Sequence, residues 1–185
     1  MDRKVVILNG EPEPSQSPVN KFLLDLRHYN SASETEIKIV DLRDSKVRQC
    51  IGCFDCWIKT PGKCRFEDDV ELILRAIIRS DLLIFASTLT MGMYSAVLKR
   101  FQDRMLPIVH PYLDMVNNEC HHRKRYPSYP NLGFIYDEND ATPAEIENVR
   151  FIYSRMSLNI HANFLLFKSV NQTTLQEFSH EISHI

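Results

Sequence analysis

Long apolar runs are missing from this sequence of 185 residues, and none approaches the ~20 residues that a membrane-spanning helix needs. A strong excess of either charge is missing as well, because the formal net charge is only −2. We therefore expect neither nucleic acid nor a membrane as a partner. No signal-peptide pattern follows Met1–Lys4, so we expect a cytoplasmic protein whose cysteines are reduced.

Glycine is scarce, with only five in the whole chain: Gly10, Gly52, Gly62, Gly92 and Gly133. Few positions therefore remain at which the backbone can approach a cofactor closely or take a positive φ. Internal repeats and low-complexity tracts are also lacking. The remaining composition is ordinary for a globular protein, with 44% hydrophobic and 25% charged residues. We expect a single domain over residues 1–185.

Five short apolar runs alternate with amphipathic helical patterns along the chain. The runs are Val5–Leu8, Ile37–Val40, Leu82–Phe85, Leu132–Tyr136 and Phe164–Phe167. Helices are indicated after Pro18, over Val70–Ile78, around Val97–Phe101, after the capping box Thr142–Glu145 and after Thr173. Continuous apolar strands separated by helices predict an α/β fold with a doubly wound five-stranded parallel sheet. Its expected order is 2-1-3-4-5, with helices on both faces and the ligand crevice beyond the strand C-termini.

Two segments lack a clear assignment. Pro107–Pro130 shows no period, and we interpret it as an excursion over or beside the site. Within it, the short basic run His121–Arg125 is typical of a solvated loop, and an anion or partner site is the alternative.

Four of the five cysteines fall in one loop with the spacing C-x2-C-x2-C-x7-C, and these are Cys50, Cys53, Cys56 and Cys64. Four thiolates suit either a [4Fe–4S] cluster or tetrahedral zinc. Gly52 and Gly62 allow the backbone to fold around such a centre. A thiol or disulfide redox role and a purely structural role remain alternatives. Cys120 stands alone.

Two stretches carry a family resemblance. The first is the cysteine loop, followed by Asp68 and Asp69. The second contains Ser95-Ala96-x-Leu98-Lys99-x-Phe101-x-Asp103-Arg104. Together they resemble the flavodoxin-like NADPH-dependent FMN reductases and, among these, the iron–sulfur flavoproteins. The resemblance extends from Lys4 to about Val170. It implies a flavodoxin-like fold and an oxidoreductase or electron carrier.

The resemblance also implies partners and an assembly. FMN would be held by the loops after strands one, three and four. Electrons would pass from a nicotinamide nucleotide, NAD(P)H, to a second acceptor that the sequence does not identify. Members often form homodimers or homotetramers, and the apolar segment Met105–Met115 is the candidate interface.

The resemblance places the cofactor residues in three groups. The phosphate would lie near Ser15, Ser17 and Asn20, which are otherwise an ordinary helix cap and turn. The flavin would lie against the loop after strand three, whose candidate residues are Ser87, Thr88, Leu89, Thr90, Met91, Gly92 and Tyr94. Packing or a subunit interface is the alternative for Met91, Met93 and Tyr94. Asp137 would contribute after strand four. No catalytic side chain is assigned, because hydride transfer to a flavin requires no protein acid or base.

The sequence departs from the family pattern at these loops. Glu11 stands where a serine is usual, Glu13 where an arginine is usual, and Pro18 where a threonine is usual. Two carboxylates would repel a phosphate, and a helix N-terminus offers only about half a positive charge in compensation. The family's tyrosine is also missing after strand three. A flavodoxin-like binding or interaction protein that has lost its flavin is therefore the alternative function.

Overall fold

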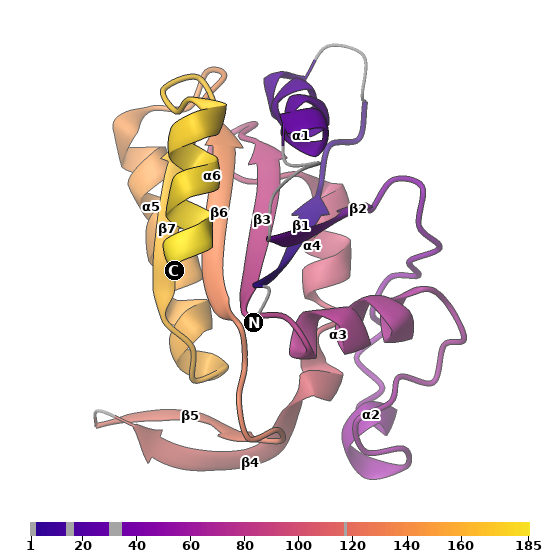
Figure 1. Ribbon diagram of the computed structural model, residues 1–185. Coiled ribbons are helices and arrows are strands. Elements are labelled where there is room, and N and C mark those ends of the chain that lie inside the picture. Colours follow the sequence, from indigo (N-terminus) through magenta and orange to yellow (C-terminus); the bar gives the residue numbers. More distant parts are fainter. Residues whose placement is uncertain (1–2, 14–16, 30–34, 117) are drawn as a thin grey trace.

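The computed structural model of the chain describes residues 3–13, 17–29, 35–116 and 118–185. Its main sheet has five parallel strands in the order β2-β1-β3-β6-β7, which confirms the expected order (Figure 1). The strands are β1 (Lys4–Asn9), β2 (Glu36–Asp41), β3 (Leu82–Thr88), β6 (Asn131–Asp137) and β7 (Phe164–Ser169). None of the helices among the described residues is long and apolar enough to cross a membrane.

The central strands are buried on both faces, which explains their uninterrupted apolar sequences. Val5 to Asn9 of β1 and Leu82 to Ser87 of β3 are all buried. In contrast, the edge strand β2 mixes exposed and half-buried residues. The neighbours of β1 are β2 on one side and β3 on the other. The order in which successive strands are added to the sheet therefore reverses at β1.

Helices cover both faces of the sheet, as expected (Figure 1). On one face lie α1 (Pro18–Tyr29) and α6 (Leu175–His184), joined by an edge-to-face contact between Phe22 and Phe178 at 5.3 Å. The core on the other face of the sheet contains residues of α3 (Val70–Ile78), α4 (Ala96–Gln102) and α5 (Pro143–Asn159). The predicted capping box of α5 is present, because the Glu145 carboxylate accepts the Thr142 N–H at 2.7 Å. The described residues also form two short helices, α2 (Asp55–Ile58) and the 3₁₀ turn η2 (Leu106–Ile108).

The segment without a period forms an antiparallel hairpin of β4 (Val109–Val116) and β5 (Glu119–Lys124). These strands could not be predicted, because they carry no clean apolar alternation and β5 is largely polar. The hairpin begins after α4, whose C-terminus reaches the edge where the parallel strands begin. In Figure 1 it lies at the end opposite the arrowheads of β3 and β6. It therefore does not cover the C-terminal edge of the sheet, contrary to the expected excursion over or beside the site.

Candidate functional site

The loop after β1 passes close to β3 and α4 at the C-terminal edge of the sheet. The backbone N–H of Gly10 donates to the carbonyl of Ala86 at 2.8 Å. A Cβ atom on Gly10 would lie 2.6 Å from Cβ of Leu98, so only glycine fits. Because the strand order reverses at β1, the edge between β1 and β3 is the place where doubly wound folds form their ligand crevice.

Glu11 is buried in that crevice, with 3% of its surface exposed. One carboxylate oxygen, Oε1, accepts the backbone N–H of Thr88, and the other, Oε2, accepts the Thr88 hydroxyl at 3.1 Å. The Ser95 hydroxyl donates to the carbonyl of Gly10. These bonds tie the loop after β1 to the loop after β3. The predicted site residue Thr88 is thus engaged by an internal anion.

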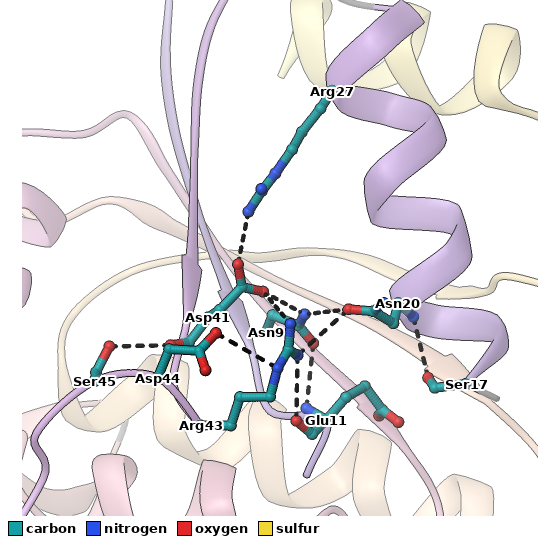
Figure 2. Close-up of polar contacts among 9 residues, drawn as sticks. All are labelled: Asn9, Glu11, Ser17, Asn20, Arg27, Asp41, Arg43, Asp44 and Ser45. Carbon is teal, nitrogen blue, oxygen red and sulfur yellow. Dashed lines mark hydrogen bonds and ion pairs between the residues drawn. The ribbon is translucent and has the colours of Figure 1, made fainter. Parts of the chain in front are cut away.

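A polar network joins the loop after β1 to α1 and β2 (Figure 2). The side chain of Asn9 donates to Asn20 Oδ1 at 3.0 Å and to Asp41 Oδ1 at 2.7 Å. The Ser17 hydroxyl accepts the N–H of Asn20 at 3.0 Å, so it caps the start of α1. Ser17 and Asn20 therefore serve this helix start, while Ser15, the third predicted phosphate residue, lies outside the described residues.

Arg43 brings a cation to this network that the sequence reasoning missed. Its Nη1 lies 3.5 Å from the carbonyl of Glu11 and 3.3 Å from Asn20 Oδ1, and its Nη2 lies 3.4 Å from Asp41. Figure 2 shows the Glu11 side chain pointing away from the guanidinium. The signal in the sequence was a polar run directly after β2, since the C-terminal ends of parallel strands share one edge.

The loop after β3 is partly core and partly surface. Ser87 and Leu89 are fully buried, and the N–H of Leu89 donates to the carbonyl of Asp137 at 2.9 Å. Thr90 and Met93 exchange two backbone hydrogen bonds around Met91 and Gly92, whose φ angles are 52° and 71°. Two successive positive φ values define a type I′ turn. Met91 at its tip is 89% exposed.

Tyr94 is buried beneath this loop and does not face the crevice. Its ring contacts Phe134 at 6.3 Å and Tyr153 at 5.4 Å, and burial raises the pKa of Tyr94. Asp137 ends β6, where it accepts the Asn171 amide at 2.7 Å. Asn171, from the loop after β7, is a second residue that the sequence reasoning missed. The structure therefore brings Thr88 and Asp137 to one edge and places Tyr94 in the core.

The donors at this edge suit the phosphate and hydroxyl groups of FMN. Thr88 offers an N–H and a hydroxyl, α1 offers its N-terminus, and Arg43 offers a positive charge nearby. Glu11 is the opposing feature, because its carboxylate holds both Thr88 donors. These donors are of the kind that a phosphate or a hydroxyl group binds, and the Glu11 carboxylate competes for the two on Thr88.

The cysteine loop lies at the other end of the molecule, where α2 is drawn beside β4 (Figure 1). Burial raises the pKa of the Cys56 thiol to about 11, and charge on Cys64, Cys50 and Cys53 contributes to the rise. The other three sulfurs thus lie within electrostatic reach of Cys56. Even so, in the part of the chain that the structure describes, no three cysteine, histidine or acidic side chains are grouped closely enough to hold a metal ion.

Two interactions fix the cysteine loop to the body. Trp57 Nε1 lies 3.0 Å from the carbonyl of Leu106 and 3.1 Å from that of Val109, so α2 is docked on η2 and the hairpin. Arg104 pairs with Asp68 through two bonds of 2.8 and 3.0 Å, and both side chains are almost fully buried. Burial alone lowers the pKa of Arg104, but Asp68 and Cys64 outweigh it and raise that pKa.

Comparisons with curated proteins find iron–sulfur flavoproteins. One from Methanocaldococcus jannaschii is 36% identical over 107 residues, which is 57% of this chain and 53% of that protein. One from Archaeoglobus fulgidus is 36% identical over 75 residues, covering 40% of this chain and 33% of that protein. The chain thus spans about half or less of the length of these relatives.

Solved structures share the fold at low identity. A NAD(P)H:quinone oxidoreductase from Methanothermobacter marburgensis has a TM-score of 0.63 at 16% identity, covering 100% of this chain and 95% of that one. An FMN-dependent NADH-azoreductase from Bacillus anthracis, solved in complex with FMN, has a TM-score of 0.62 at 12% identity, covering 98% and 96%. The flavodoxin-like fold is therefore shown. The family model described as NADPH-dependent FMN reductase matches residues 3–122, well over half of the sequence, and the chain belongs to that family.

Proposed function

We propose that this chain binds FMN between β1 and β3 and passes electrons from NAD(P)H to a second acceptor. The observation that carries the proposal is that the loop after β1 meets the loop after β3 at the point where the strand order of the sheet reverses. There both donors of Thr88 point at an anion, the carboxylate of Glu11. An anionic or hydroxyl-rich ligand is the type of molecule these donors would bind. Membership of the NADPH-dependent FMN reductase family supports FMN as that ligand.

The side chains of this chain would position the cofactor. The phosphate would lie at the N-terminus of α1, near Ser15, Ser17 and Asn20, with the charge of Arg43 close by. The turn at Met91 and Gly92 would border the flavin. The bound flavin would supply the hydride and electron chemistry, while the protein supplies position and electrostatics. No side chain is assigned as an acid or base.

We also propose that Cys50, Cys53, Cys56 and Cys64 bind a [4Fe–4S] cluster. Four thiols of one loop are the usual donors of such clusters, and the influence of Cys50, Cys53 and Cys64 on Cys56 supports their nearness to it. The names of the relatives support it too. The loop would have to close further around the metal. Metal analysis separates iron from zinc. A disulfide and a purely structural loop are the alternatives that remain when neither metal is found.

For the cell and the assembly, we propose a cytoplasmic homodimer or homotetramer. The exposed side chains of Tyr112, Leu113 and Met115 support Met105–Met115 as the interface. An apolar group of this kind on one hairpin is typical of protein contacts.

The test of the main proposal is a titration of the purified protein with FMN, followed by quenching of flavin fluorescence. We expect saturable binding, and the loaded protein should oxidise NADH or NADPH when an acceptor is present. If high micromolar FMN causes no saturable quenching, the flavin proposal is wrong. The chain would then be a flavodoxin-like binding protein without the cofactor.

A further inference from the structure

A cavity of about 400 Å³ lies at the end of the molecule away from the flavin crevice. Its walls come from the end of the cysteine loop, from α3, from η2 and from the residues that follow β5. Cavities that bind small ligands range from about 300 to 1,000 Å³, so this one is large enough for a small organic molecule.

Positive charge dominates the lining of this cavity. Lys63, Arg75, Arg79 and Arg125 line it together with a single carboxylate, Glu71. Glu71 is shared by Arg75 at 2.7 Å and Lys63 at 3.5 Å. Among residues 3–13, 17–29, 35–116 and 118–185, no carboxylate lies within ion-pair distance of Arg79 or Arg125. Two guanidinium groups therefore remain without an internal counter-charge.

Arg125 also has an unused donor. Its Nη2 donates to the carbonyl of Val109 at 3.2 Å, but its Nε is buried and has no acceptor among the described residues. Leaving a buried donor on a charged group unpaired is costly, and an added anion would remove that cost. Gly62 lies beside this side chain, because a Cβ atom there would be 3.5 Å from Arg125 Cδ and 3.8 Å from its Cζ.

The rest of the lining is apolar. Val70, Leu74 and Ile108 are nearly fully buried and line the cavity, and Tyr126 adds an aromatic face. A site with an apolar wall and a few convergent charges selects a molecule that has an apolar body and a charged head.

We propose that this cavity binds a small organic anion. Its carboxylate or phosphate head would pair with Arg125 and Arg79, and its apolar body would pack against Leu74 and Ile108. Cys64 lies in the same wall, so the bound molecule would touch the cysteine loop. The site is separate from the flavin crevice and does not depend on flavin binding.

The test is isothermal titration calorimetry with phenyl phosphate, which joins an anionic head to an apolar ring. We expect one molecule to bind per chain, at least tenfold more tightly than inorganic phosphate or benzyl alcohol. Saturating FMN should leave the affinity unchanged. The Arg125→Gln substitution should weaken binding at least tenfold. The matched control is Arg123→Gln, two residues away, because Arg123 is exposed, pairs with Asp114 and does not line the cavity.

Position is checked by acetylation of lysine amines with acetic anhydride and peptide mass spectrometry. Bound phenyl phosphate should slow the labelling of Lys63, which lines the cavity, and leave that of the exposed Lys38 on β2 unchanged. If Arg125→Gln does not fold, Arg79→Gln replaces it, at the exposed residue that directly follows α3. Absence of saturable heat, competition by FMN, or an equal loss in the cavity variant and in Arg123→Gln would each overturn the proposal.

Discussion

The carboxylate of Glu11 accepts hydrogen bonds from both donors of Thr88, one from its backbone and one from its hydroxyl. Through this contact an acidic side chain takes up both donors of Thr88, a residue of the loop proposed to border the flavin. A phosphate bound at the start of α1, as proposed, would carry charge of the same sign as Glu11. We therefore expect Glu11 to lower the affinity for FMN.

The first prediction concerns this competition. Changing Glu11→Gln keeps the size of the side chain and removes its charge. Two unit charges ~4 Å apart repel by about 1 kcal/mol in water and about 4 kcal/mol at an effective dielectric constant near 20. We expect the dissociation constant for FMN to fall at least tenfold, which corresponds to ~1.4 kcal/mol. The measurement is fluorescence titration with FMN and, in parallel, with riboflavin.

Riboflavin lacks the phosphate, so its affinity should barely change. Glu13→Gln is the matched control, because Glu13 is exposed in the same loop and its charge is better screened. An equal gain for both flavins would mean that the substitution reshaped the loop. The electrostatic explanation would then be abandoned.

The second prediction concerns the cysteine loop. Protein purified without oxygen should be brown and contain about four irons per chain. Cys53→Ser should remove most of that iron and leave the far-ultraviolet circular dichroism unchanged, because the loop lies outside the parallel sheet. Cys120→Ser, in the hairpin, should keep the full iron content. Colourless protein with neither iron nor zinc would contradict the cluster.

The third prediction concerns the buried pair of Asp68 and Arg104. Asp68→Asn leaves a buried guanidinium without its counter-charge. Breaking a buried ion pair from one side costs about 3–5 kcal/mol of unfolding free energy. Urea unfolding would measure the loss. Asp114→Asn, which breaks the exposed pair with Arg123, should leave the unfolding midpoint nearly unchanged.

The same pair predicts a loss of stability in acid. Burial alone would raise the pKa of Asp68, but hydrogen bonds from Arg104 and from the N–H of Arg48 outweigh it and lower that pKa. A lowered folded-state pKa contributes stability above the unfolded value of about 3.9, and the contribution disappears as the pH falls through the folded value. The wild type should therefore lose more stability than Asp68→Asn below about pH 4. If the unfolding free energies of the two proteins fall with pH at the same slope in that range, the lowered pKa of Asp68 is contradicted.

The fourth prediction compares the buried Tyr153 with the half-buried Tyr129. The Tyr153 hydroxyl has no hydrogen-bond partner among the residues that the structure describes, so Tyr153→Phe should keep or raise the unfolding free energy, by up to about 1 kcal/mol. The Tyr129 hydroxyl donates to the carbonyl of Ile108 at 2.6 Å and accepts the N–H of Arg125 at 2.8 Å. Tyr129→Phe should therefore lose about 1–3 kcal/mol. Equal effects in thermal unfolding would contradict this difference.

The parallel sheet could be predicted because burial on both faces leaves an apolar run in the central strands β1, β3 and β6. The capping box of α5 could be predicted because the bonds between Thr142 and Glu145 are local in sequence. Strands β4 and β5 could not, since their pairing is not recorded in an apolar alternation. Most residues of the hairpin are exposed or half-buried, so burial imposes no apolar pattern on its sequence.

The candidate site was predicted only in outline. The edge of the sheet follows from topology, and Thr88 and Asp137 lie there as the strand ends require. The bond between Glu11 and Thr88 joins residues 77 positions apart, and no local pattern encodes it. The approach of Arg43 to Asn20 likewise depends on how β2 and α1 pack together. Such tertiary contacts decide whether the loop attracts or repels a phosphate.

The docking of Trp57 has an optical consequence. It is the only tryptophan of the chain, and its indole lies between the cysteine helix α2 and the hairpin, bonded to two carbonyls. Its emission therefore reports on that junction and on no other part of the molecule. A red shift on warming would signal that water has reached the junction, even while the parallel sheet is intact. The sequence thus contains a natural spectroscopic probe beside the one loop whose conformation a metal would change.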